Sequence, residues 1–498
     1  MQFNTAEFLI FFAAIFCIYY LTRPTWRWVV LLTASLFFYA TLKAPQLIIA
    51  LALVTIISYI VGRILARLPD ESGTRKMVLW LGILLNLAVL AIIRYLPDLA
   101  NFLPVLSLPL HNLPNLGVSV GVSFYVFQAI SYLVDIYYDE QPAEYHLGYF
   151  SLYISFFPKL LQGPIERASN LLPQLHKPKA LTDEMIRSAL LLFAWGLFKK
   201  VVIADRLGIL VDAVYDHLPK YVGISLWLAT FFYALQIYCD FSGYTDMAIG
   251  VARLLGINLS INFNKPYLAV SIADFWRRWH ISFSTWIFDY IFKPVQMNLR
   301  RWKTWASPVA LLVTFFLSGI WHGASWGFVV WGLLHGIYMA VYVLLAPYEK
   351  KFLRRFKLEK STVVRLIQIA FTFVLICFAW IFFRAKTLAD GWYVVSHLFP
   401  GLNILNSLMT SIIHDQPIPK VGLQNYFTIG GSPVDYIFVL IGLLVLLAVE
   451  LPENLAKTRL GIAFQKNMVF RWVVYWLLVM SILTIGAIVQ TEFVYFRF

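Results

Sequence analysis

The chain has 498 residues, of which 60% are hydrophobic and only 13% are charged, and its mean hydropathy is +0.73. This composition excludes a soluble globular protein and predicts an all-α, polytopic membrane protein. The net charge of +14 does not indicate nucleic-acid binding, because the basic residues form short clusters between apolar runs, where they act as topology determinants.

Apolar runs that suit the roughly 20 residues needed to cross a hydrocarbon core recur along the whole chain. They lie near residues 6–21, 28–43, 46–66, 77–96, 116–138, 183–204, 222–240, 305–320, 324–346, 363–384, 434–451 and 472–490. We therefore expect about 11–13 transmembrane helices. The first run has no basic residue before it and no cleavage site after it, so we expect an uncleaved helix with an external N-terminus.

The basic clusters predict the orientation of these spans. Alternate crossings place four clusters on the inner side: Arg23–Arg27, Arg63–Lys76, Lys350–Lys360 and Lys457–Arg471. The opposite loops, 97–116 and 388–433, contain Lys420 as their only lysine or arginine. This asymmetry satisfies the positive-inside rule and places both termini outside the cytoplasm.

The regions 139–182 and 241–304 fit a simple pattern of spans poorly, because Pro, Gly, Arg and Asp interrupt them. Irregular backbone at membrane depth is tolerated where protein or a water-filled cavity satisfies its polar groups. We expect re-entrant or interfacial segments here. No internal repeat or flexible linker divides the chain, so we expect a single domain over residues 1–498, with its catalytic centre at about 150–345 and an external cap at about 388–433.

The three cysteines lie far apart in apolar sequence, without the spacing of a metal site or a disulfide framework. We expect Cys17, Cys239 and Cys377 to be small buried hydrophobic residues. We expect no metal and no permanently bound cofactor.

Four polar segments interrupt the apolar sequence in the central part of the chain. They are Phe156–Arg167, which contains two prolines and a glycine, Gln236–Asp246, Asp274–Ser282 and Leu317–Gly327. The fourth contains His322 between apolar residues and glycines, and His335 follows thirteen residues later. An ionisable side chain at membrane depth costs roughly 2.5–3.5 kcal/mol, so by default it marks a functional site.

Each polar residue also has a purely structural interpretation. Asp240 and Asp246 suit either a buried ion pair with Arg277 or Arg278 or a place in the active site. The two arginines suit interfacial anchoring as well as substrate binding. His335 is interpreted as a hydrogen-bonded packing residue. For His280 a packing role and a functional role remain equally open. Loop positions predict solvated side chains for His111, His146, His176, His217, His397 and His414.

One buried histidine with nearby carboxylates suits acyl transfer from a thioester. Imidazole titrates near neutrality, so it takes a proton from an attacking hydroxyl, while a thiolate leaves with little help. The chain contains no nucleotide-binding glycine motif, which disfavours ATP-driven transport and dinucleotide chemistry. A transporter or flippase of lipid-linked glycans remains an alternative, although such folds commonly show repeated halves. A scaffold for a polysaccharide synthase is a third.

The order of these segments resembles the membrane-bound O-acyltransferase superfamily over nearly the whole chain. The resemblance rests on Gln162–Ile165, Asp240–Tyr244, Asp274–His280, Gly319–Gly323 and the ending Tyr495–Phe498. Within the superfamily the chain is similar to the bacterial alginate and peptidoglycan O-acetyltransferases, with the teichoic-acid D-alanylation proteins as cousins. The resemblance implies helices around a central funnel, with His322 as the catalytic histidine and His280 as the second family histidine.

The resemblance also implies the reaction and its partners. An acetyl group from acetyl-CoA or an acyl-carrier thioester is expected to cross the bacterial inner membrane to an extracytoplasmic serine hydrolase-like (SGNH) partner, which modifies a polysaccharide such as alginate. D-alanyl transfer to teichoic acid is the alternative within the family. We expect the remaining substrate-binding residues to be Gln162, Asp246, Trp276, Arg277, Arg278 and Trp321. Basic residues at 277–303 suit the phosphates of the donor, or plain inner-side topology.

Overall fold

The computed structural model describes residues 1–70, 72–94, 121–323, 325–399, 429–430, 432–452, 455–487 and 493–494. Within these ranges the chain is helical and contains no β-strand. Seven of the described helices are long and apolar enough to span a membrane, or up to eight if the bent pair α24–α25 counts as one span. Two shorter apolar helices, α1 and α7, have 16 residues each. The protein is therefore a polytopic all-α membrane protein.

The chain divides into two compact units, each of which is described by itself. Unit 1 comprises Met1–Gly196, Tyr244–Asn262 and Ser282–Trp286, and unit 2 comprises Leu197–Gly243, Phe263–Ile281 and Ile287–Phe498. The expectation of a single domain over the whole chain stays a prediction.

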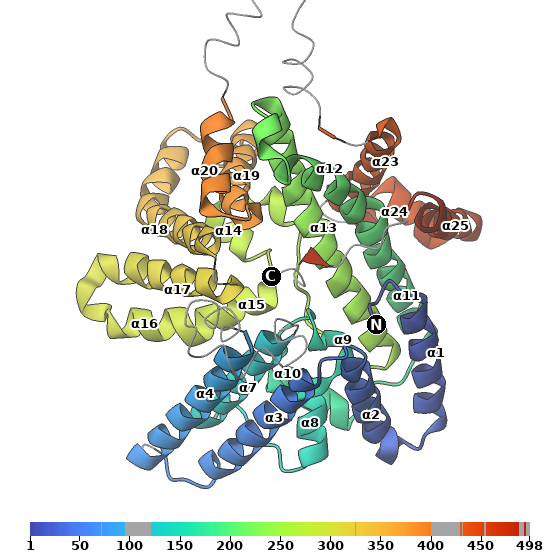
Figure 1. Ribbon diagram of the computed structural model, residues 1–498, viewed down its shortest axis with the longest axis vertical. Coiled ribbons are helices and arrows are strands. Elements are labelled where there is room, and N and C mark those ends of the chain that lie inside the picture. The colour runs from blue at the N-terminus through green and yellow to red at the C-terminus, as the bar shows by residue number, and fades with distance from the viewer. Residues whose placement is uncertain are drawn as a thin grey trace, which may run out of the picture. The chain divides into compact units, whose positions relative to one another are not determined.

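The helices of unit 1 are mostly long and apolar. They are α1 (Ala6–Leu21), α2 (Arg27–Ala40), α3 (Pro45–Leu65), α4 (Gly73–Arg94), α7 (Val122–Tyr137), α8 (Leu147–Ser155), α9 (Phe157–Leu160), α10 (Ala168–His176) and α11 (Asp183–Phe198), which extends two residues into unit 2. Helices α3 and α4 form a hairpin against α7 (Figure 1). Helix α3 buries Leu47 and Val54 but exposes Ile49 and Ile56. An exposed face as apolar as the buried one suits contact with lipid.

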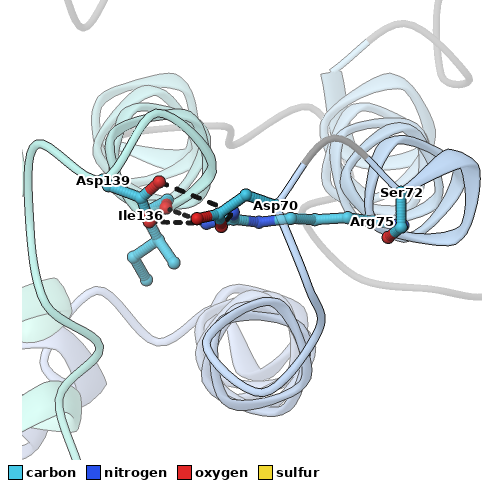
Figure 2. A network of polar contacts seen from close by, with 5 residues as sticks. All are labelled: Asp70, Ser72, Arg75, Ile136 and Asp139. Carbon is cyan, nitrogen blue, oxygen red and sulfur yellow. Dashed lines mark hydrogen bonds and ion pairs between the residues drawn. The ribbon is translucent and has the colours of Figure 1, made fainter.

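A buried arginine joins α4 to the end of α7 in unit 1 (Figure 2). Arg75 donates from Nη2 to the Ile136 carbonyl oxygen at 3.0 Å and to Asp139 Oδ1 at 2.6 Å, and from Nη1 to Asp70. The backbone N–H of Arg75 donates to Ser72 Oγ at 3.1 Å. These bonds fix the start of α4 against the residues that follow α7.

Unit 2 combines long helices with many short ones. It contains the π-helical segment η2 (Lys199–Ala204), α12 (Asp205–Tyr215), most of α13 (Ile224–Leu254), α14 (Ile272–Trp276), α16 (Lys293–Asn298), α17 (Ala306–His322), α18 (Trp326–Arg355), α19 (Thr362–Arg384), α20 (Leu388–His397), α23 (Pro433–Glu450), α24 (Arg459–Lys466) and α25 (Met468–Thr484). Helix α15 (Ile281–Ile287) connects the two units in sequence. Short 3-10, π and α segments fill residues 263–305, which is the irregular backbone that the sequence predicts there.

Helices α17 and α18 approach each other closely within unit 2 (Figure 1). A Cβ added to Gly319 would lie 2.5 Å from the carbonyl oxygen of Phe328, and one added to Gly332 would lie 3.0 Å from the Cα of Gly319. Glycine on both helices lets the two backbones meet, as small residues do at helix contacts within membranes.

Several expectations fall on positions outside the described residues: most of the predicted external cap, the loop 97–116, His111, His414 and the ending Tyr495–Phe498. The start of that cap is described as α20. Cys239 and Cys377 are buried as expected. Cys17, on α1, is exposed, so the expectation for Cys17 is wrong. An apolar run does not say which of its faces meets protein and which meets lipid.

Candidate active site

His322 is the last residue of α17, directly before the break that separates this helix from α18. Its side chain is buried, with 4% of the residue exposed. The imidazole lies among four aromatic rings of unit 2, with centroid distances of 4.5 Å to Trp321, 4.9 Å to Trp331, 5.0 Å to Phe383 and 6.1 Å to Phe328. Helices α17, α18 and α19 therefore all contribute to its surroundings, and the expected break between helices at His322 is observed.

Glycine at position 323 is what lets the chain turn so close to the histidine. A Cβ at Gly323 would lie 2.9 Å from the ring of Phe328. Helix α18 begins three residues later, and Oγ of its N-cap residue Ser325 accepts a hydrogen bond from the Gly327 N–H at 3.3 Å. Because glycine has no Cβ, the backbone here can pass close to the ring of Phe328.

His280 lies between α14 and α15 and has an unusual backbone conformation. Its φ is +41°, in the left-handed region that few non-glycine residues adopt. The residue is 1% exposed, and its ring meets that of Phe241 edge to face at 4.7 Å. Burial lowers the pKa of His280 to about 3, so the ring is neutral at physiological pH. Backbone strain at a buried neutral histidine is typical of a functional position.

His335 lies on α18 and is completely buried. Its Nδ1 accepts a hydrogen bond from Trp276 Nε1 at 3.3 Å, and its ring centroid lies 5.0 Å from that of Trp331. The expectation of a hydrogen-bonded packing residue describes these contacts. Trp331 is a neighbour of both His322 and His335.

An ion pair with Arg277 or Arg278 was one of the two interpretations of Asp240, and these partners are wrong. Asp240 Oδ1 pairs with Lys200 Nζ at 2.8 Å, and Asp240 Oδ2 accepts the Val494 N–H at 2.8 Å. Lys200 also pairs with Asp205 at 2.8 Å, and its Nζ lies 4.3 Å from the ring centroid of Phe493. The sequence reasoning missed this cluster, although a lysine pair inside the apolar run 183–204 was a signal for it.

The two arginines have different surroundings. Arg278 pairs with Asp274 at 3.0 Å, one helical turn away, and Arg277 is exposed. The other basic residues predicted to meet the donor are exposed as well: Lys293, which pairs with Asp289 at 2.8 Å, Arg300, Arg301 and Lys303. Trp276 and Trp321 are buried in unit 2, and Asp246 is half-buried in unit 1.

Gln162 belongs to unit 1 and is 1% exposed. Neither its amide nitrogen nor its amide oxygen has a hydrogen-bond partner among the described residues. A Cβ on the next residue, Gly163, would collide with the backbone of Lys159, so glycine is required for this turn. Buried side-chain amides are normally hydrogen-bonded, and an unpaired one suits a group that meets a ligand.

Comparison with known proteins gives a family for most of the chain. Residues 35–384 match the model of the MBOAT, membrane-bound O-acyltransferase family. The match includes Gln162, His280, His322 and His335, and it ends at the last residue of α19.

Curated relatives agree with this match. The chain is 33% identical to a probable alginate O-acetylase, AlgI, of Azotobacter vinelandii over 404 residues, which cover 80% of this chain and 78% of the relative. It is 33% identical to a peptidoglycan O-acetyltransferase of Helicobacter pylori, covering 77% and 76%. A teichoic acid D-alanyltransferase of Bacillus subtilis is 30% identical, covering 58% and 74%. The chain is an acyltransferase that belongs to the membrane-bound O-acyltransferase family.

Proposed function

We propose that this enzyme transfers an acetyl group from a cytoplasmic thioester to a hydroxyl group on the extracytoplasmic side, with His322 as the general base. One observation carries the proposal: an ionisable ring is buried at the break between two apolar helices, where its desolvation is costly. Aromatic packing alone would be served better by an apolar side chain at this position.

The reaction follows from the chemistry of imidazole. A nitrogen of His322 takes the proton of the acceptor hydroxyl while that oxygen bonds to the thioester carbonyl carbon. The electron pair of the C=O π bond moves onto the carbonyl oxygen and then re-forms the double bond as the C–S bond breaks. The leaving sulfur takes the electron pair of that bond and the proton from the imidazolium, so His322 returns to its neutral state.

His280 and Gln162 are the next candidates. His280 is neutral and held in a strained conformation, which supports a positioning or proton-handling role. The buried amide of Gln162 supports a contact with substrate, because it offers both a donor and an acceptor that described residues do not use. Trp276, Trp321, Asp246, Arg277 and Arg278 remain proposed substrate contacts.

The donor is proposed to be acetyl-CoA or an acyl-carrier thioester, whose phosphates suit the exposed basic residues of 277–303. The acceptor is proposed to be a serine hydroxyl of an extracytoplasmic SGNH hydrolase-like protein, which passes the group to a polysaccharide such as alginate. The names of the alginate and peptidoglycan relatives support O-acetyl transfer.

The test uses the full-length protein in nanodiscs with acetyl-CoA labelled on the acetyl group. We expect thioester consumption that depends on an added acceptor and is abolished in His322→Ala. His217→Ala is the matched control, because His217 is exposed and lies in a loop of the same unit. Equal turnover in His322→Ala and in the unmodified protein would refute the role of His322.

D-alanyl transfer is a second candidate, favoured by the similarity to the teichoic acid enzyme. The same preparation, supplied with D-alanyl carrier protein in place of acetyl-CoA, separates the two. Consumption of the D-alanyl thioester alone would replace the acetyl proposal while leaving His322 as the base.

A further inference from the structure

Two buried N–H donors lie one turn apart on α18, and the one on Trp331 lies beside His322. Trp276 Nε1 can only donate, so His335 Nδ1 is the acceptor of their hydrogen bond, and the neutral ring of His335 carries its proton on Nε2. Trp331, four residues earlier, carries an N–H on Nε1. His335 is 0% exposed and Trp331 is 1% exposed.

Neither of these N–H groups has a hydrogen-bond acceptor among the described residues. Leaving a buried donor unpaired costs about 1–3 kcal/mol, and native proteins rarely accept that cost without a reason. Two such donors on neighbouring turns indicate a place where an oxygen atom from outside the chain is bound.

The position of these donors suggests which oxygen it is. The ring of Trp331 lies 4.9 Å from that of His322 and 5.0 Å from that of His335, centroid to centroid, so Trp331 adjoins both the proposed base and the second donor. Acyl transfer places a full negative charge on the carbonyl oxygen when the hydroxyl attacks. Fixed N–H donors aimed at that oxygen are usually the largest single contribution to such catalysis.

We propose that Trp331 Nε1–H and His335 Nε2–H form the oxyanion hole of this enzyme and bind the thioester carbonyl oxygen. This inference rests on the proposed acyl transfer. The two groups give up no proton: they hydrogen-bond to the oxygen while it holds the electron pair of the former π bond, and they release it when the double bond re-forms. Trp276 keeps His335 in the required tautomer and is a positioning residue.

The first experiment measures kcat and KM for acetyl-CoA in nanodiscs, normalised to folded protein. Trp331→Phe and His335→Leu each remove one donor and keep an apolar side chain in place. We expect each to lower kcat by about 10²–10³-fold, whereas KM rises only by the smaller factor that reflects the hydrogen bond lost to the neutral carbonyl of the bound substrate. His335→Gln retains an N–H donor and should recover at least tenfold over His335→Leu. Trp380→Phe is the matched control, because Trp380 stacks on Trp331 at 5.9 Å, and we expect less than a tenfold loss.

The second experiment works without turnover. Acetonyl-CoA, in which a methylene group separates the sulfur from the carbonyl so that no acyl–sulfur bond can break, is compared with ethyl-CoA, which has no carbonyl oxygen. We expect Trp331→Phe and His335→Leu to weaken binding of acetonyl-CoA and to leave the binding of ethyl-CoA unchanged.

Three results would overturn the oxyanion hole. They are a kcat within threefold of the unmodified protein in both donor variants while His322→Ala is inactive, a turnover of His335→Gln no higher than that of His335→Leu, and an equal loss of affinity for the two analogues. The first of these refutes the oxyanion hole and leaves the proposed function standing. Thioester consumption that is unaffected by His322→Ala refutes the proposed function itself.

Discussion

At the scale of single residues, His280 combines a left-handed backbone with complete burial. Its pKa is lowered from 6.5 to about 3, so the unfolded chain binds a proton at mildly acidic pH that the folded chain rejects. The stability contributed by the neutral ring is present above pH 6.5 and is lost as the pH falls below it.

This linkage gives the first prediction. Between pH 7 and pH 5 the unmodified protein should lose about 2 kcal/mol of unfolding free energy through His280 alone. His280→Asn removes the titrating group, and asparagine tolerates the left-handed region. The thermal midpoint in detergent, recorded by tryptophan fluorescence, should therefore fall less steeply with pH in the variant. Parallel pH profiles would contradict the assignment, and His217→Ala provides the control for an exposed histidine.

Sequence reasoning located single residues well where a local pattern constrains them. The gap between the apolar runs 305–320 and 324–346 predicted a break at His322 that the structure has. The Lys200–Asp240 pair and the Trp276–His335 hydrogen bond were not predicted from the sequence. Their members are 40 and 59 residues apart, respectively. Such partners depend on how helices are placed in space, and no periodicity within one segment encodes that placement.

At the scale of elements, the crossing of α17 and α18 fixes His322 relative to Trp331. The second prediction concerns Gly332, where an added methyl group meets the backbone of Gly319 at 3.0 Å. Because neither backbone can give way cheaply, Gly332→Ala should cost about 1–3 kcal/mol of stability. It should also lower acyl transfer by displacing α18.

Gly73→Ala is the control for this substitution, because a Cβ at Gly73 meets nothing within 4 Å. It should leave both the thermal midpoint and turnover unchanged or raise the midpoint slightly, since alanine reduces the entropy of the unfolded chain. Equal effects of the two substitutions would show that the close approach of α17 and α18 does not matter.

The hydrogen bonds of Arg75 connect α4 to the end of α7 and give a third prediction. Arg75→Met removes charge-assisted bonds to Asp139 and to the Ile136 carbonyl. We expect the free energy of unfolding to fall by about 1–2 kcal/mol, a modest figure because the carboxylates of Asp70 and Asp139 are exposed. Lys76→Met removes the same charge from an exposed neighbour and should change stability by less than about 0.5 kcal/mol. Thermal unfolding in detergent measures both, and a comparable shift in the two variants would contradict the role of Arg75.

At the scale of the whole molecule, the fourth prediction concerns orientation. The cluster Lys350–Lys360 spans the last turns of α18 and the residues after it, and α19 separates it from the start of α20. In a Cys17→Ser background, a membrane-impermeant maleimide should label Ala389→Cys in intact spheroplasts but Lys351→Cys only after lysis. Both positions are exposed, so accessibility of the side chain itself is not limiting. The reverse labelling pattern would refute the predicted topology.

The helices of the molecule were largely predictable, because lipid requires long apolar segments with internal hydrogen bonds. Each of the twelve apolar runs overlaps a described helix, from α1 to α25. The exact spans were not predictable in the middle third, where α14 and α16 have five and six residues. There the course of the backbone follows from tertiary contacts such as those of His280 and Trp276.

The cluster around Lys200 has a consequence for biosynthesis. The ring of Phe493 contacts Lys200, and the Val494 N–H donates a hydrogen bond to Asp240. Val494 is synthesised 254 residues after Asp240. During the second half of translation, therefore, Lys200, Asp205 and Asp240 have been made but lack the contacts that Phe493 and Val494 provide. A stalled or shortened nascent chain would lack these contacts permanently. The exposed charges would then distinguish it from the folded enzyme and make it a target for proteases of membrane quality control.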